Sequence, residues 1–321
     1  MSGNDSATTI DIVCLGEAMG QFVPDDGPLE DATTFSLGQA GAESNVAIAT
    51  ARLGVRSAWV SRLGDDAVGE RLLKALAEES VDTSAVVRDQ EHPTGIFLKD
   101  PSGLSRKVSY YRKGSAASRM DRGDVDRALA LRPAFMHLSG ITSALSDSCD
   151  DAIEYALESA AALGITTSFD VNYRPVLWSD QNRASARLSA LADKSDIVFV
   201  GLDEAEILWG AADADAAAAH LSGAGRVVVK NGAESATVHS PAGRWEVPAL
   251  SVDVVESVGA GDAFAAGWLG GMIHGVDDRM RLRCGHLMAR TALTSLSDHG
   301  ERIAWDALLA DAADPAIWVR R

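Results

Sequence analysis

The stretch Glu256-Ser257-Val258-Gly259-Ala260-Gly261-Asp262-Ala263-Phe264-Ala265-Ala266-Gly267 is the most informative in the sequence. It runs a pair of glycines directly into an alanine-rich segment that favours a helix. Glycine lets a backbone approach an anion closely, and the free N–H groups at a helix start converge on such a ligand. We therefore predict an anion-binding turn in which the amides of Ala260, Gly261 and Asp262 face the ligand.

Asp262 is unusual in that position, because a carboxylate repels an anion bound beside it. Its charge is useful if the carboxylate takes the proton from a hydroxyl that attacks a phosphoryl group. The alternative is that Asp262 only stabilises the start of its helix, as aspartates in a first turn commonly do. The residues on either side of this stretch are needed to choose between the two interpretations.

Strand-like and helix-like segments alternate along most of the chain. We predict strands at 10–17, 57–64, 134–138, 166–171, 196–200, 226–230 and 236–239, and helices at 43–53, 66–79, 146–163, 179–192, 211–220, 261–275 and 278–296. This order predicts a parallel sheet covered by helices on both faces. Two further strands, at 94–99 and 106–112, flank the turn signal Asp100-Pro101-Ser102-Gly103 and predict a hairpin outside that sheet.

The composition is that of a globular protein, with 46% hydrophobic and 23% charged residues. The net charge of −17 argues against nucleic-acid and membrane partners. It also works against any anionic ligand, so an anion site has to be built locally from arginines or helix N–H groups. The polar, acidic start at residues 1–6 predicts a disordered beginning of a cytoplasmic protein. Cys14, Cys149 and Cys284 match no metal or redox spacing, and we expect them to be reduced and buried.

The string Gly259-Ala260-Gly261-Asp262 resembles the signature of the ribokinase-like (PfkB) carbohydrate kinases and lies late in the chain, as it does in that family. Residues 16–17, 40–47, 53–54 and 64–69 resemble further segments of the family, so the resemblance covers nearly the whole chain. It implies one domain, 1–321, folded as an α/β protein: a ribokinase-like three-layer α/β/α sandwich with a mostly parallel central sheet and a small β-sheet lid formed by about 18–40 and 92–116. It also implies a homo-oligomer, a dimer or larger.

The same resemblance implies the cofactors ATP and Mg²⁺. Asp262 would be the catalytic base, and the amides of Gly259, Ala260 and Gly261 would form the anion hole. The residues expected at the nucleotide are Lys230, Gly232, Gly259, Gly261 and Asp298. Glu204 is expected to order magnesium through water, although glycine at position 201 replaces the family's asparagine.

Within the family, residues 110–116 and 170–174 resemble 2-keto-3-deoxygluconate kinases. A sugar acid needs cations, and arginine holds a carboxylate with two parallel hydrogen bonds, so Arg112 and Arg174 are the expected partners of that group. The residues expected to line the substrate are Gly41, Asn45, Phe97, Tyr110, Arg112, Arg174 and Asp262. The implied reaction is ATP-dependent phosphorylation of 2-keto-3-deoxygluconate to 2-keto-3-deoxy-6-phosphogluconate.

Several alternatives stay open at this level. A neutral-sugar kinase such as a fructokinase or ribokinase, or a 2-keto-3-deoxygalactonate kinase, shares most of these features. A dinucleotide-dependent oxidoreductase is disfavoured because Phe264 occupies the third small position of that fingerprint. A sugar sensor without catalysis is disfavoured by Asp262. Two departures from the family pattern are Ala40, which would be strained at a positive φ, and Glu256, which replaces a commoner aspartate, so we make no claim of a monovalent-cation site.

Overall fold

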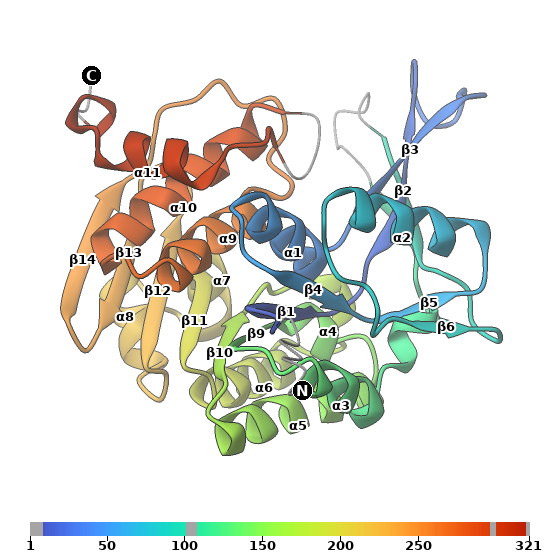
Figure 1. Cartoon of the computed structure of the whole chain (residues 1–321), viewed down its shortest axis with the longest axis horizontal. Helices are drawn as coiled ribbons and strands as arrows, with labels where there is room; N and C mark the ends of the chain where they lie inside the picture. The colour runs from blue at the N-terminus through green and yellow to red at the C-terminus, as the bar shows by residue number, and fades with distance from the viewer. Residues whose placement is uncertain (1–8, 101–107, 296–299, 319–321) are drawn as a thin grey trace, which may run out of the picture.

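The computed structural model describes residues 9–100, 108–295 and 300–318 (Figure 1). Within that part of the chain, the central sheet has the strand order β14-β13-β12-β11-β10-β9-β1-β4. Its strands are β1 (Ile12–Leu15), β4 (Ser57–Val60), β9 (Phe135–Ser139), β10 (Thr166–Asp170), β11 (Ile197–Gly201), β12 (Arg226–Asn231), β13 (Ser235–Ser240) and β14 (Gly243–Pro248). The pairs from β4 to β12 are parallel, while β13 and β14 are antiparallel additions at one edge.

Helices cover both faces of this sheet, as predicted (Figure 1). One face packs against α1 (Ala42–Arg52), α9 (Ala260–Ile273), α10 (Asp278–Leu293) and α11 (Trp305–Ala313), with α2 (Ala67–Glu78) extending that layer. The other face packs against α3 (Arg122–Ala130), α5 (Asp147–Leu163), α6 (Gln181–Asp193), α7 (Leu202–Trp209) and α8 (Ala214–His220). The alternation of a strand explains both layers: in β11, Val198 and Val200 belong to one buried cluster, and Ile197 and Phe199 to the other.

A separate small sheet lies beside α2 (Figure 1). Its order is β3 (Phe35–Ala40), β2 (Met19–Pro24), β7 (Ile96–Lys99) and β8 (Val108–Tyr111). The predicted hairpin is present as the antiparallel pair β7–β8, but it is not a separate appendage, because β7 also pairs in parallel with β2. The pattern of side chains did not reveal β2 and β3, and the turn residues 101–103 lie outside the described part of the chain.

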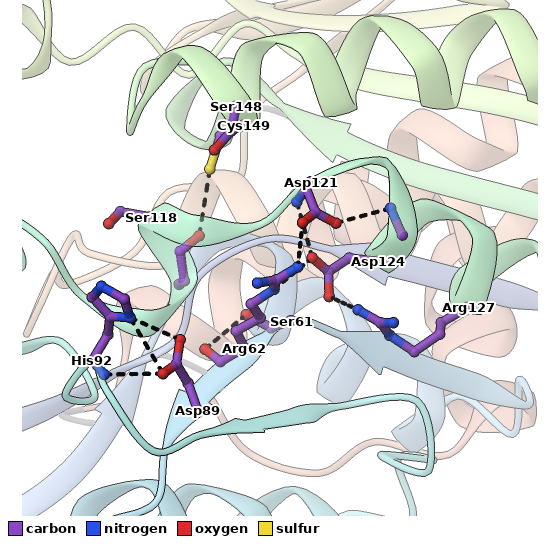
Figure 2. A network of polar contacts seen from close by, with 12 residues as sticks. Ser61, Arg62, Asp89, His92, Ser118, Asp121, Asp124, Arg127, Ser148 and Cys149 are labelled. Carbon is purple, nitrogen blue, oxygen red and sulfur yellow. Dashed lines mark hydrogen bonds and ion pairs between the residues drawn. The ribbon is translucent and has the colours of Figure 1, made fainter.

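The predicted strand at 57–64 is wrong as a single element. The chain leaves the central sheet after β4, and β5 (Arg62–Gly64) pairs with β6 (Val87–Asp89) in a two-stranded sheet. The cause is Arg62, whose guanidinium turns to Asp121 and Asp124 at the start of α3, where Nε donates to Asp124 Oδ2 at 2.7 Å (Figure 2). An ion-pair network of this kind, in which Asp124 is buried and Asp121 is half exposed, cannot be accommodated between two layers of apolar side chains.

Other departures are smaller. The pattern overlooked β14, α3, α7 and α11, together with the short α4 (Gly140–Ser143) and the 3₁₀ turns Ala116–Arg119, Pro175–Leu177 and Pro315–Trp318. Ala40 does not adopt a positive φ, so it replaces glycine without strain. The three cysteines are free and buried, as predicted. The N-terminal residues 1–6 lie outside the described residues. No helix in the described ranges has the length and apolar character needed to cross a bilayer.

Candidate active site

A cavity of about 1640 Å³ lies where the carboxyl ends of the central strands meet the small sheet and the start of α9. Such strand ends are where open α/β sheets bind their ligands. The described residues that the sequence predicted for the site all line this cavity: Gly41, Asn45, Phe97, Tyr110, Arg112, Arg174, Glu204, Lys230, Gly232, Gly259, Ala260, Gly261 and Asp262. Asp298 lies outside the described residues.

The turn before α9 has the geometry of an anion site. Gly259 has φ 82°, a left-handed conformation that favours glycine, and it forms the N-cap of α9. The first helical hydrogen bond runs from Ala263 N to Gly259 O at 2.9 Å, so the amides of Gly261 and Asp262 precede the ladder of the helix. The helix behind them packs closely against α10, because a Cβ at Gly267 would lie 2.5 Å from Cys284 O. The amides therefore face the cavity from a closely packed support.

The carboxyl of Asp262 is held at the same turn. Asn45 of α1 donates from Nδ2 to Asp262 Oδ2 at 2.8 Å. Burial is the main cause that raises the pKa of Asp262 to about 7. The hydrogen bond from Asn45 acts to lower that pKa, whereas the nearby charge of Asp170 acts to raise it further. A carboxyl with that pKa exchanges a proton near neutral pH, which suits a general base.

Lys230 supplies a positive charge beside this carboxyl. Its Nζ donates to Asp170 Oδ2 at 2.7 Å, and a Cβ at Gly261 would lie 3.5 Å from the same nitrogen. Burial alone would lower the pKa of Lys230, but Asp170, Glu204 and Asp262 outweigh it and hold that pKa above its usual value. The ammonium group thus stays charged next to the anion turn. Asp170 was not predicted as a site residue, although its place at the carboxyl end of an apolar strand is a signal that could have found it.

Glu204 lies at the start of α7 with both oxygens engaged. Oε2 accepts from Gly201 N at 2.9 Å and Oε1 from Tyr173 N at 2.8 Å. Burial, followed by the charge of Asp170, raises the pKa of Glu204. Within the described ranges, no group of three or more His, Cys, Asp or Glu side chains could hold a metal ion. Lys230 already pairs with Asp170, and two backbone amides already bind Glu204, so a magnesium ion at this end of the cavity would be held mainly by phosphate oxygens and water, the usual arrangement for Mg²⁺.

The two predicted arginines differ in their surroundings. Arg112 follows β8, and its Nε donates at 2.7 Å to Glu17 Oε2, while Ser115 Oγ donates at 2.6 Å to Oε1 of the same carboxylate. Arg174 is half exposed, with its Nη1 3.6 Å from Glu204 Oε1. Arg112 is thus partly neutralised by a buried carboxylate that the sequence reasoning missed, whereas Arg174 keeps a freer charge.

Aromatic side chains of the small sheet line the cavity near Arg112. The rings of Phe97 and Tyr110 lie 5.6 Å apart, and the Arg112 guanidinium lies 5.9 Å from the Tyr110 centroid. Phe97 is buried, whereas half of Tyr110 is exposed. The cavity is thus lined by two arginines, a tyrosine hydroxyl, apolar rings and the anion turn. This combination suits a small polar molecule placed against a phosphate.

A glycine-rich helix start, a carboxyl poised near neutral pH and a charged lysine in one cavity define an α/β enzyme site for anionic ligands. The model of the pfkB family carbohydrate kinases matches residues 9–301, and the chain belongs to that family. This confirms the family that the Gly-Ala-Gly-Asp segment indicated, and it excludes the oxidoreductase alternative.

The chain is similar to two proteins named 2-dehydro-3-deoxygluconokinase. It is 36% identical over 300 residues to the one from Bacillus subtilis (strain 168), covering 90% of this chain and 91% of the relative. It is 37% identical over 281 residues to the one from Thermoproteus tenax, covering 85% of each. The crystal structure of a PfkB protein from Polaromonas sp. JS666 superposes with a TM-score of 0.84 at 37% identity, over 90% of this chain and 97% of that one. The predicted fold is thereby confirmed.

Proposed function

We propose that this carbohydrate kinase transfers the γ-phosphoryl group of ATP to the terminal hydroxyl of 2-keto-3-deoxygluconate (2-dehydro-3-deoxygluconate), giving 2-keto-3-deoxy-6-phosphogluconate. The observation that carries the proposal is the Asp262 carboxyl, with a pKa of about 7, beside the open amides at the start of α9. The names of the two relatives support the choice of substrate.

In this reaction Asp262 accepts the hydroxyl proton as the substrate oxygen forms its bond to the γ-phosphorus and the bond to the ADP oxygen breaks. The amides of Gly261 and Asp262, which precede the helical ladder, stabilise the charge on the phosphoryl oxygens together with those of Gly259 and Ala260, the latter shared with Ser257 O at 3.4 Å. Lys230 and Gly232 face the nucleotide phosphates. The positive charge of Lys230 also acts to lower the pKa of Asp262 and so favours its ionised form. Magnesium, when bound, neutralises the phosphate charge, and we assign Glu204 to its water shell.

We assign the carboxylate of the substrate to Arg174 and Arg112, and its hydroxyls to Asn45, Tyr110 and the backbone of Gly41. The Asn45 Oδ1 atom supports this assignment, because it is buried without a partner among the described residues. Phe97 packs against the carbon chain. The small sheet, within 18–40 and 92–116, acts in this proposal as a lid that excludes water, which is the competing nucleophile.

We also propose that the enzyme works in the cytoplasm as a homo-oligomer, a dimer or larger. The exposed Tyr111 on the edge strand β8 supports this, since unpaired edges offer a surface to a second copy. Light scattering coupled to size exclusion tests it, and a monomer at high concentration would contradict it.

An ADP-release assay over a panel of carbohydrates tests the substrate. We expect turnover with 2-keto-3-deoxygluconate to exceed turnover with ribose or fructose by about a hundredfold or more, because a neutral sugar offers no carboxylate to Arg174 and Arg112. The galactonate epimer keeps the carboxylate and serves as the closest comparison. Faster turnover of a neutral sugar would remove the sugar acid from the proposal.

The pH profile tests the base. Since the pKa of Asp262 is raised to about 7, its carboxyl is protonated below that pH, and we expect kcat/KM to fall about tenfold per pH unit there and to level off above it. Asn45→Ala removes a donor that favours the charged form, so the inflection should move to higher pH. Single-turnover rates over pH 5 to 9 measure both. A profile that stays flat down to pH 5 would be inconsistent with Asp262 as the base.

A further inference from the structure

The small sheet and the anion turn are joined by a buried ion pair. Lys99 is the last residue of β7, and Glu256 lies in the segment that leads into α9, three residues before Gly259. Their side chains form an ion pair, with 12% of the lysine and 10% of the glutamate side chain exposed. Lys99 also lines the cavity, together with Ser257 and Val258 of the turn. One contact therefore joins the small sheet to the loop that leads into the anion turn.

Glu256 organises the turn itself. Its Oε1 accepts from Ser257 N at 2.8 Å and from Val258 N at 3.2 Å, while Oε2 faces Lys99. Behind it, Val255 N donates to Leu293 O at the end of α10 at 2.8 Å. Burial acts to raise the pKa of Glu256, but Lys99 and the two amides outweigh burial and hold that pKa below its usual range. The carboxylate is thus ionised, and it orients the peptide units that directly precede the anion turn.

Lys99 is also linked to the part of the cavity that the small sheet lines. Phe97 and Lys99 are two residues apart on β7, so their side chains lie on the same face of the strand. Phe97 contacts Tyr110, and both line the cavity beside Arg112. A molecule that packs against Phe97 would therefore fix the position of β7. The next residue on the same face of β7 is Lys99, which pairs with Glu256. A nearly buried ion pair is sensitive to such shifts, because separating it leaves an uncompensated charge.

We propose that the Lys99–Glu256 pair couples carbohydrate binding under the small sheet to nucleotide binding at the start of α9, with Lys99 as a positioning residue. This inference rests on the proposed function. A substrate that packs against Phe97 fixes β7 with the Lys99 ammonium against Glu256, and this holds in place the turn whose amides receive the γ-phosphate. By linkage, the nucleotide then favours carbohydrate binding by the same factor.

Calorimetric titration of the full-length protein with Mg²⁺ and a non-hydrolysable ATP analogue, with and without saturating 2-keto-3-deoxygluconate, measures this coupling. For the wild type we expect the sugar acid to tighten analogue binding by about tenfold, within the usual range of such couplings. For Lys99→Met we expect the factor to fall to about one, with each ligand alone binding within about threefold of wild type and kcat reduced. Glu256→Gln keeps an oxygen for the Ser257 and Val258 amides but removes the charge, and it should behave in the same way.

The double variant Lys99→Met/Glu256→Gln guards against misfolding, because it removes both charges together. We expect it to be no worse than either single variant, as for two residues that act through one contact. Lys74→Met, an exposed lysine on α2, is the matched control and should keep the wild-type factor. The proposal is overturned if Lys99→Met keeps the full coupling, or if it weakens analogue binding equally with and without the sugar acid, which would indicate direct contact with phosphate. A wild type that turns over no sugar acid would instead contradict the proposed substrate, and the coupling would then be measured with the carbohydrate that the panel identifies.

Discussion

Asp262→Asn is expected to lower kcat by about a hundredfold or more, the usual effect of losing a general base, while the ATP analogue still binds. The amide is nearly the same size as the carboxyl and keeps an oxygen for the hydrogen bond from Asn45, so the start of α9 should keep its geometry. Only proton acceptance is lost. Steady-state ADP release and calorimetric binding of the analogue measure the two effects separately.

Asp306→Asn is the matched control for this variant. Asp306 also lies in the first turn of a helix, α11, but it is exposed and does not line the cavity. If Asp262 only stabilised its helix, both variants would lose a few tenths of a kcal/mol of stability and little activity. Near-wild-type turnover by Asp262→Asn would exclude this residue as the base.

Arg174→Ala is expected to lower kcat/KM for the sugar acid by about ten- to a hundredfold, since a hydrogen bond to a charged group contributes about 1.5–3 kcal/mol. The KM for ATP should change by less than about twofold, because a residue that contacts only one ligand mainly affects that ligand. Folding should be unaffected: Glu204, the weak partner of Arg174, keeps its two backbone donors. Kinetics with each substrate varied in turn provide the measurement.

Arg183→Ala is a suitable comparison, because Arg183 is also exposed and also has an ion-pair distance of 3.6 Å, to Asp147. It should leave both KM values unchanged. Equal losses for ATP and the sugar acid in Arg174→Ala would point to a general disturbance instead of a lost carboxylate contact. Arg112 is a poorer test, since its removal would leave the buried Glu17 carboxylate with Ser115 as its remaining partner and would destabilise the fold.

Local patterns account for what the sequence predicted well. The Gly259 to Gly261 turn depends on glycine conformations and on helix N–H groups that are adjacent in the chain. The buried strands and their covering helices follow from the period of apolar residues, as β11 illustrates. The pattern failed at β2 and β3, which are partly exposed, and at Arg62, where a charged contact with α3 takes the chain out of the central sheet.

The sequence by itself therefore determined the family, the layered architecture and the position of the proposed base. The tertiary structure alone decided which charges meet. Asn45 reaches Asp262 across 217 residues and Glu17 reaches Arg112 across 95, while Lys99 of the small sheet contacts Glu256 in the loop before α9. The physical reason is that the pKa of a side chain depends on its burial and on its distance from other charges. Burial and these distances are fixed only when the strand ends, the small sheet and the start of α9 enclose one cavity.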